Sequence, residues 1–389
     1  MPDVDLTSRI GRYITTTTAS EPVKAYVPPN LPPVPPIDMQ SLSNLVSDAM
    51  LALGRLDGVR SVAPDTSLFL YMYVRKEALL SSQIEGTQSS LSDLLLYENE
   101  QAPGAPIDDV EEVSTYVAAL DHGLKRLEGG FPLSMRLMRE MHSILLSTGR
   151  GSTKLPGEFR QSQNWIGGTR PGNAIFVPPP PGSVLDLMTD LETFLHEDDD
   201  LPAIVKAGIA HLQFETIHPF LDGNGRLGRL LITLYLCSEG ILEEPLLYLS
   251  LYLKTHRTVY YQLLNEVRDH GRWEVWLEFF LTGVKEVAEQ ANGAARRITK
   301  IFEDDADKIS KLKRAAASAR KVHDVMRQRP IVTVALIMEL CDTTAPTATN
   351  ALYNLINLKI VREVTGRERG RVFAYTEYLE VLDEGTDPI

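Results

Sequence analysis

From residue 42 onward, apolar side chains recur at spacings of three and four residues, and this periodicity constrains the fold more than any other feature. Leu42, Leu45, Ala49, Leu53 and Leu56 form the first such stripe, which is typical of a helix with one buried face. Further helices are expected at 67–86, 109–127, 133–146, 184–196, 202–215, 225–239 and 256–268. No β-α-β alternation accompanies them, so we expect a mainly α-helical fold.

Composition sets the broad class of the protein. The 389 residues, 43% of them hydrophobic, are enough for two or three domains with a sizeable core. The net charge of −13 argues against a protein that coats nucleic acid, although one basic module stays open. Only two cysteines are present, far apart, which excludes a disulfide framework and favours a reducing compartment. With no signal peptide and no apolar run long enough for a membrane span, we expect a cytoplasmic protein that does not contact a membrane.

Two segments interrupt the helical series. The first 40 residues are rich in Thr and Pro, and the run PPNLPPVPP at 28–36 favours an extended strap over a helical body. Residues 157–182 contain alternating apolar positions, a Gly/Pro/Asn turn and four consecutive prolines, which predict a β-hairpin. We therefore divide the chain into an N-terminal region (1–105), a central domain (106–295) and a C-terminal part (296–389).

The C-terminal part has a different character from the rest. A basic helix at 311–329 is followed by a short helix, another helix and two strands around a Gly/Arg turn. This order predicts a small winged helix-turn-helix domain. Arg367, Arg369 and Arg371 suit contacts to a nucleic-acid backbone, but the acidic end of the chain suits a protein or self-association role equally well.

The run HPFLDGNGRLGR at 218–229 carries the chemistry of the chain. It follows one apolar helix and precedes another, so DGNG occupies a turn at a helix N-terminus, where free N–H groups and the helix dipole attract anions. Arg226 and Arg229 in the first helical turn oppose that dipole and therefore need an anionic partner such as a polyphosphate.

Phosphate chemistry also accounts for the other polar residues of the run. Mg²⁺ prefers carboxylate and phosphate oxygens, and Asp222 lies beside the anion turn. His218 can act as a general base on an incoming hydroxyl. The embedded G-x-G-x-x-G follows a helix rather than a strand, so it is no dinucleotide-binding fingerprint. We read the run as a site that transfers a phosphate or nucleotide group to a hydroxyl.

The run matches H-P-F-x-[D/E]-G-N-G-R-x-x-R throughout, and residues of about 40 to 290 resemble the Fic family. The resemblance implies a helical fold with a β-hairpin flap and the transfer of AMP from ATP, with Mg²⁺, to a Ser, Thr or Tyr hydroxyl of a target protein. It implies His218 as the base, Asp222 as the Mg²⁺ ligand, and Arg226 and Arg229 at the outer phosphates. The ATP site that it implies includes Asp222, Gly223, Asn224, Gly225, Arg226, Leu227, Gly228 and Arg229 in the motif, Tyr260 and Tyr261 near the adenine, and Ile166, Gly167 and Gly168 in the flap.

A second motif lies upstream. Ser81, Glu85 and Gly86 fit [S/T]-x-x-x-E-[G/N], which resembles the inhibitory helix motif of Fic proteins. We expect Glu85 to pair with Arg229 and so misalign ATP for in-line attack.

Several functions stay open beside an autoinhibited AMP-transferase. They are removal of AMP from modified proteins, phosphoryl transfer, and a nucleotide-sensing DNA-binding regulator. Self-modification and a homodimer are compatible with the sequence, which does not identify the target protein.

Overall fold

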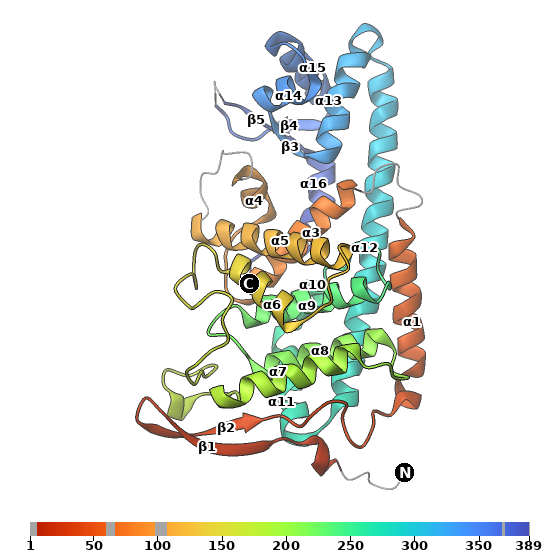
Figure 1. Cartoon of the computed structure of the whole chain (residues 1–389). Coiled ribbons are helices and arrows are strands. Elements are labelled where there is room, and N and C mark those ends of the chain that lie inside the picture. Colours follow the sequence, from red (N-terminus) through yellow and green to blue (C-terminus); the bar gives the residue numbers. More distant parts are fainter. Residues whose placement is uncertain (1–5, 60–66, 98–106, 368–369, 389) are drawn as a thin grey trace.

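The computed structural model of the chain describes residues 6–59, 67–97, 107–367 and 370–388. Helix α12 (Trp273–Ser310) runs along one side of the molecule and joins a large helical body to a smaller C-terminal part (Figure 1). It packs against α1 (Met39–Asp57) in the body and against α16 (Thr376–Asp383) farther along. The fold is mainly helical, as the periodicity predicted.

The centre of the helical body is α8 (Ala203–Ile217), in which every residue from Ile204 onward is buried. A helix that is buried on all sides belongs in the core of a large domain. The other described helices of the body are α3 (Ser67–Ile84), α4 (Leu91–Tyr97), α5 (Ile107–Glu128), α6 (Met135–Leu145), α7 (Pro181–His196), α9 (Asn224–Ser238), α10 (Ser250–Thr255) and α11 (Arg257–His270).

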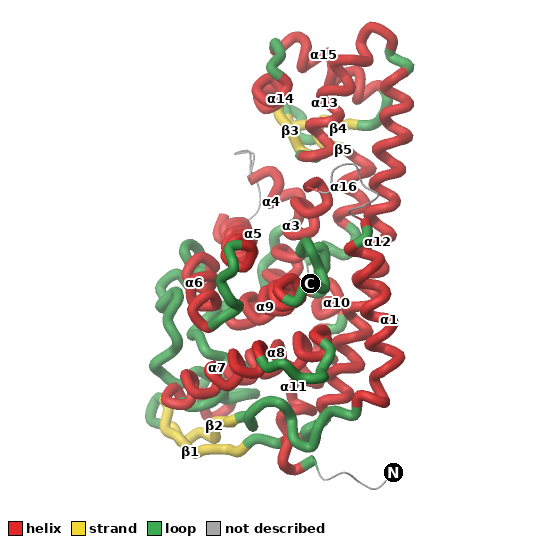
Figure 2. The backbone as a smooth tube through the Cα atoms, turned by 45° about the vertical axis from the view of Figure 1, so that its right-hand side comes forward, coloured by secondary structure: helices red, strands yellow, loops and turns green. Residues whose placement is uncertain are grey.

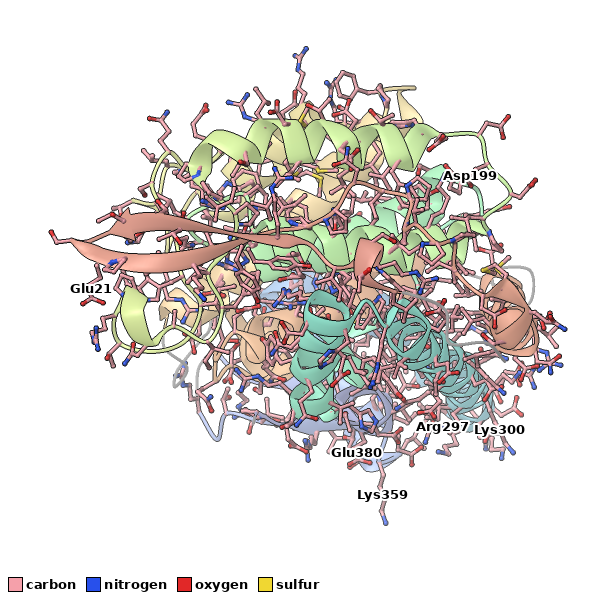
Figure 3. All side chains as sticks on the ribbon, turned by 90° about the horizontal axis from the view of Figure 1, so that it is seen from below. Glu21, Asp199, Arg297, Lys300, Lys359 and Glu380 are labelled. Atoms are coloured by element: carbon pink, nitrogen blue, oxygen red, sulfur yellow. The ribbon has the colours of Figure 1, made fainter. Side chains whose placement is uncertain are left out.

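The N-terminal segment corrects part of the expected strap. After a short 3₁₀ turn, η1 (Thr7–Arg9), β1 (Arg12–Thr18) and β2 (Glu21–Val27) form an antiparallel hairpin (Figures 1 and 3). A run of β-branched threonines suits a strand, and Ala19 and Ser20 make the turn with φ of 48° and 67°. The proline run that follows does cross the body, because Leu31 N donates to Asp190 of α7 at 3.0 Å.

The segment 157–182, which we call the flap segment, also differs from expectation. The predicted β-hairpin is reduced to one bridge between Ile166 and Phe176, and η2 (Pro171–Asn173) lies in the connection. Prolines cannot donate to a strand ladder, and four of them follow directly at 178–181. The antiparallel pairing of the two arms therefore stops at this bridge.

Strand β2 supports the flap segment, which has only one β-bridge of its own. Tyr26 N donates to Val177 O at 2.9 Å. Glu21 accepts a hydrogen bond from Arg170 Nη1 at 2.7 Å. The N-terminal hairpin thus holds the flap segment against the body from the outside.

The C-terminal module, residues 316–383, contains the predicted helices and strands. They are α13 (Ala316–Gln328), β3 (Ile331–Thr333), α14 (Val334–Cys341), α15 (Ala345–Asn357), β4 (Val361–Glu363), β5 (Val372–Tyr375) and α16, preceded by η3 (Lys313–Ala315). The strands form an antiparallel sheet in the order β3-β5-β4 (Figure 2). Arg369 lies outside the described residues, and the winged-helix identity stays a prediction.

The module is joined to the body by structure as well as by sequence. The predicted domain boundary at 295–296 falls inside α12, which continues to Ser310. The buried Asp305 of α12 accepts a hydrogen bond from Tyr375 of β5 at 2.8 Å. Tyr375 in turn lies 3.0 Å from His323 Nε2 of α13. One continuous buried core runs from the body into the module.

Candidate functional site

The motif turn lies between two buried helices. His218 ends α8 with a left-handed backbone, φ 50°, and its N–H donates to Phe214 O at 2.9 Å. Gly223, with φ 76°, is the N-cap residue of α9, which begins at Asn224. Because Gly223 and Gly225 carry no side chains over the first turn of α9, free backbone N–H groups there can face an anion.

Asn224 holds the turn in place. Its side-chain amide donates to Phe220 O and accepts from Phe220 N, both at 2.9 Å, and the residue is buried. The side chain closes the loop, and only its backbone N–H can face a ligand.

His142 of α6, which sequence reasoning missed, braces the same turn. Its Nδ1 accepts from Gly157 N at 2.8 Å, and its Nε2 lies 2.9 Å from Asp222 O. Burial lowers the pKa of His142 to about 4, so the ring is neutral and Nε2 donates. The ring also stacks on Phe220 at 3.7 Å. Only its place on the apolar face of a predicted helix marks it in the sequence, and that signal names no role.

Arg229 is held by the upstream motif. Its Nη2 donates to Glu85 Oε1 at 2.7 Å and to Ser81 O at 3.0 Å, while its Nε donates to Ser81 Oγ at 2.8 Å. The contact expected between Glu85 and Arg229 is therefore present. A Cβ added at Gly225 would lie only 2.1 Å from Glu85 Oε1. The carboxylate of Glu85 thus lies directly over the first turn of α9.

Arg226 does not reach outward beside Arg229. It is buried, with Nη1 2.9 Å from Glu112 Oε1 of α5 and Nη2 3.7 Å from Asp222 Oδ1. Glu112 and Asp222 are thus its partners here, and the pairing of both arginines with the outer phosphates stays a prediction. Glu112, another residue that sequence reasoning missed, lies more than 100 positions upstream, where no motif marks it.

A cavity of about 300 Å³ opens beside this cluster. It is lined by Glu85, Asn164, Trp165, Ile166, Gly167, His218, Leu221, Asp222, Gly223, Asn224, Gly225 and Arg226. Leu227 is buried in the core, and an added Cβ at Gly228 would meet Phe214 and Glu215, so neither lines the cavity and their expected ATP contact stays a prediction. Gly168 does not line this cavity, and the space that a side chain would need there is occupied by Asn173 of the flap segment.

A second cavity, of about 330 Å³, shares Ile166 with the first. Its wall includes Phe176 of the flap segment and Tyr261, Arg257 and Leu264 of α11. Tyr261 is 38% exposed, in agreement with a place on a ligand-binding surface. Tyr260 is instead buried, and its hydroxyl lies 3.0 Å from His211 Nε2, so its expected contact with the nucleotide stays a prediction.

The charges of the site favour a neutral base beside an ion pair. Burial, with the nearby Arg160 and Arg268, lowers the pKa of His218 to about 3. Burial of Glu85 opposes its ionisation, but the charge and hydrogen bond of Arg229 outweigh that effect and hold the pKa of Glu85 below its ordinary value. The imidazole of His218 can therefore accept a proton at neutral pH, while Glu85 stays ionised.

Asp222 fits the role of a ligand to a cation that is shared with phosphate. Its Oδ1 accepts from Gly223 N at 2.6 Å, and its side chain is 33% exposed at the cavity. Across the described ranges, no three His, Cys, Asp or Glu side chains cluster in a way that could hold a metal ion. Mg²⁺ commonly takes one or two carboxylates, with the remaining ligands from phosphates and water. The donor set fits that pattern.

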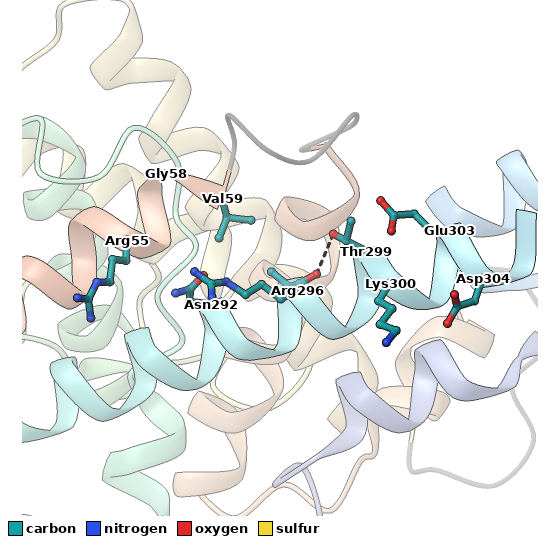
Figure 4. A pocket seen from close by; sticks show the side chains of 10 residues that line it. Arg55, Gly58, Val59, Asn292, Arg296, Thr299, Lys300, Glu303 and Asp304 are labelled. Carbon is teal, nitrogen blue, oxygen red and sulfur yellow. Dashed lines mark hydrogen bonds between the residues drawn. The ribbon is translucent and has the colours of Figure 1, made fainter.

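A third cavity lies far from the motif. It has a volume of about 490 Å³ and lies between the end of α1 and the middle of α12 (Figure 4). Its lining combines cations such as Arg55 and Lys300 with the acids Glu303 and Asp304, and includes no residue of the 218–229 run. The candidate site is therefore the pair of cavities at the motif. No helix among the described residues is both long enough and apolar enough to cross a bilayer.

Fold and cavity together define a helical protein with a glycine-rich helix N-terminus beside a histidine in one cavity. Comparison with known proteins gives the family. The Fic/DOC family N-terminal model matches residues 43–125, and the Fic/DOC family model matches residues 132–236. Residues 43–125 and 132–236 of the chain therefore carry the two Fic/DOC family matches.

Relatives and solved structures agree with this assignment. The chain is 28% identical over 270 residues to the protein adenylyltransferase Fic of Drosophila melanogaster, covering 65% of this chain and 51% of the relative. It is 29% identical over 210 residues to that of Drosophila yakuba, covering 52% and 39%. The chain thus spans about half or less of the length of these relatives.

The solved structures show the fold. A Fic family protein from Desulfovibrio desulfuricans G20 is similar with a TM-score of 0.57 at 20% identity, over 86% of this chain and 96% of that one. A Fic domain containing signaling protein from Bacteroides thetaiotaomicron VPI-5482 is similar with a TM-score of 0.53 at 18% identity, over 65% and 97%.

Proposed function

We propose that the protein is an autoinhibited adenylyltransferase that moves AMP from ATP to a Ser, Thr or Tyr hydroxyl of a target protein. One observation carries the proposal. The Glu85 carboxylate lies over the first turn of α9 and binds Arg229, beside a cavity that also holds His218. Relatives that bear the name protein adenylyltransferase support the same reaction.

In this proposal, the nucleotide spans both cavities. The phosphates lie against the N–H groups of the turn at Gly223 and Gly225, and the base lies beside Tyr261 in the second cavity. His218 takes the proton of the target hydroxyl as its oxygen bonds to the α-phosphorus. The bond from the α-phosphorus to the bridging oxygen breaks, and pyrophosphate leaves. Asp222 would hold Mg²⁺, which supplies charge neutralisation for the phosphates.

Inhibition follows from competition for one guanidinium. An outer phosphate that pairs with Arg229 must displace Glu85, and while Glu85 remains its negative charge repels the phosphate. ATP then binds in a pose that does not align the α-phosphorus with an incoming oxygen. Because Glu85 is 32% exposed and Arg229 only 2%, the arginine stays fixed and the glutamate is the exchangeable partner.

The experiment compares two labels. We incubate the Glu85→Gly variant with ATP labelled at the α- or the γ-phosphate and follow label on protein. We expect label from the α position alone, and its loss when His218→Ala is added. Label from the γ position alone would instead indicate a kinase. Absence of protein label from either ATP, with a folded variant, would contradict a transferase and leave removal of AMP from modified proteins to be tested.

A further inference from the structure

The chain does not end in the C-terminal module. After α16 it turns back toward the helical body, and its end lies near α9 and α10 rather than beside α14 and α15 (Figures 1 and 2). Residues 384–387, with the sequence Glu-Gly-Thr-Asp, make this return, and we call them the return segment. Although the segment is polar, its Thr386 is buried.

The return segment is bound through its backbone. Lys76 Nζ of α3 donates to Glu384 O at 2.7 Å, and Gln83 Nε2 of α3 donates to Thr386 O at 2.8 Å. Lys254 Nζ of α10 donates to Gly385 O at 3.3 Å and also to Asp387 O. All three donor side chains are buried, so α3 and α10 present a built site for successive carbonyl groups of an extended segment.

The same donors lie next to the motif that holds Arg229. Gln83 Nε2 also donates to Ser89 O at 3.0 Å, and Gln83 O accepts from Gly86 N at 3.0 Å. Gln83 thus fastens the turn that ends α3, the turn in which Glu85 stands. A residue that binds the return segment is therefore part of the backbone arrangement that places the Glu85 carboxylate.

The other end of the return segment is fixed to α12 and the module. Arg297 of α12 donates twice to the Glu384 carboxylate, at 2.8 and 2.5 Å. The segment follows α16 directly, and α16 buries Tyr378 against Tyr375 of β5. A shift of the module relative to α12 would therefore pull on the segment. Polar contacts of this kind open at lower cost than the apolar core around them.

We propose that α3 and α10 form a docking site whose occupant is the return segment, and that its occupancy keeps Glu85 on Arg229. The segment is a second clamp on the inhibitory helix, and the C-terminal module controls it. The effect on activity rests on the proposed function, whereas the docking itself does not.

Gly385 offers a specific way to displace the segment. It has φ of 80°, and a Cβ added there would lie 2.7 Å from Leu251 Cδ1. Gly366, with φ of 62° and no atom within 4 Å of an added Cβ, is the matched control. Gly385→Ala and Gly366→Ala impose similar backbone strain, but only the first also brings an added Cβ against a side chain of α10.

The test measures activity and backbone exchange in the full chain. We expect Gly385→Ala to raise AMP transfer roughly fivefold, which corresponds to about 1 kcal/mol for one net hydrogen bond, and to leave Glu85→Gly activity unchanged in the double variant. Amide hydrogen exchange at 82–88 should accelerate in Gly385→Ala and not in Gly366→Ala. Lys254→Met should act in the same way as Gly385→Ala.

The outcomes separate the two proposals. If Glu85→Gly is inactive, the proposed function fails, and hydrogen exchange alone decides the docking. If Glu85→Gly is active but Gly385→Ala matches Gly366→Ala in both rate and exchange, the docking proposal is overturned. Faster exchange without a change in rate would overturn the coupling to Glu85.

Discussion

The ion pair between Glu85 and Arg229 yields the sharpest prediction. The Glu85→Gly change removes one charged acceptor from a buried guanidinium, while Ser81 keeps its two hydrogen bonds to the same group. A hydrogen bond to a charged group contributes about 1.5–3 kcal/mol. If that energy opposes correct phosphate binding, its removal raises the rate of AMP transfer roughly 10- to 150-fold. Glu85→Gln, which keeps the size and loses the charge, should fall between wild type and Glu85→Gly.

The assay needs a control for glycine itself. Gln88 is exposed and lies three residues further along the same turn region, so Gln88→Gly adds similar backbone freedom without touching Arg229. For each variant, initial rates are measured at saturating ATP, and thermal unfolding is measured with and without ATP. We expect Glu85→Gly to melt a few degrees lower without ATP, because Arg229 has lost an acceptor, and to gain more from ATP than wild type. Equal activation by Gln88→Gly, or no activation of a folded Glu85→Gly that binds ATP, would refute the reasoning.

Three further predictions concern the base, the second cavity and the C-terminal module. Because the pKa of His218 is lowered to about 3, its imidazole is already neutral at pH 5. A plot of kcat/KM against pH for Glu85→Gly should therefore show no acid limb near pH 6.5. An acid limb there would contradict the buried environment of His218. Tyr261→Ala should raise KM for ATP several-fold, whereas Tyr260→Phe should lower thermal stability and leave KM unchanged, and kinetics with melting curves checks both. Helix α15 contains no Lys or Arg, so gel shifts across salt concentrations should show no salt-dependent DNA binding; a steep salt dependence would favour the DNA role.

The central helices and the motif turn could be predicted because their signals are local. The mostly apolar sequence of α8 and the apolar stripe of α9 mark two buried helices, and the glycines at 223 and 225 permit the turn between them. The Glu85–Arg229 contact could be predicted from two motifs far apart in the chain, through their resemblance to a family. Periodicity alone gives no information about such a contact.

The hydrogen-bond partners of some polar residues in the motif could not be predicted from residue type alone. Arg226 suits a phosphate by type, yet Glu112 of α5 takes its side chain. Asn224 suits an anion hole, yet Phe220 takes both ends of its amide. In each case the residue type limits which hydrogen bonds and ion pairs the side chain can form, and the folded structure determines the partner.

The structure differs from the sequence-based expectation in two segments that involve strands, and the reasons are opposite. Thr15–Thr18 and β2 form a hairpin although its turn, Ala19-Ser20, lacks the glycine or asparagine that usually marks one. The flap segment carries the expected turn glycines but its prolines remove the N–H groups that a ladder needs. The hairpin compensates for that loss by supplying β2 as the neighbour of the flap segment.

In the proposed mechanism, the arrangement around Arg229 would let a small movement control the site. Ser81 binds Nε and Nη2 through its hydroxyl and its carbonyl, so the guanidinium plane is fixed by α3 whether or not Glu85 is in place. An arriving phosphate therefore has to displace one carboxylate and does not have to reorient the arginine. Glu85 stands just beyond the last residue of α3, Ile84, in a turn fastened by Gln83. In the proposed mechanism, loosening that turn alone would release Glu85 from Arg229, while Ser81 and the rest of α3 would keep the arginine in position for the nucleotide.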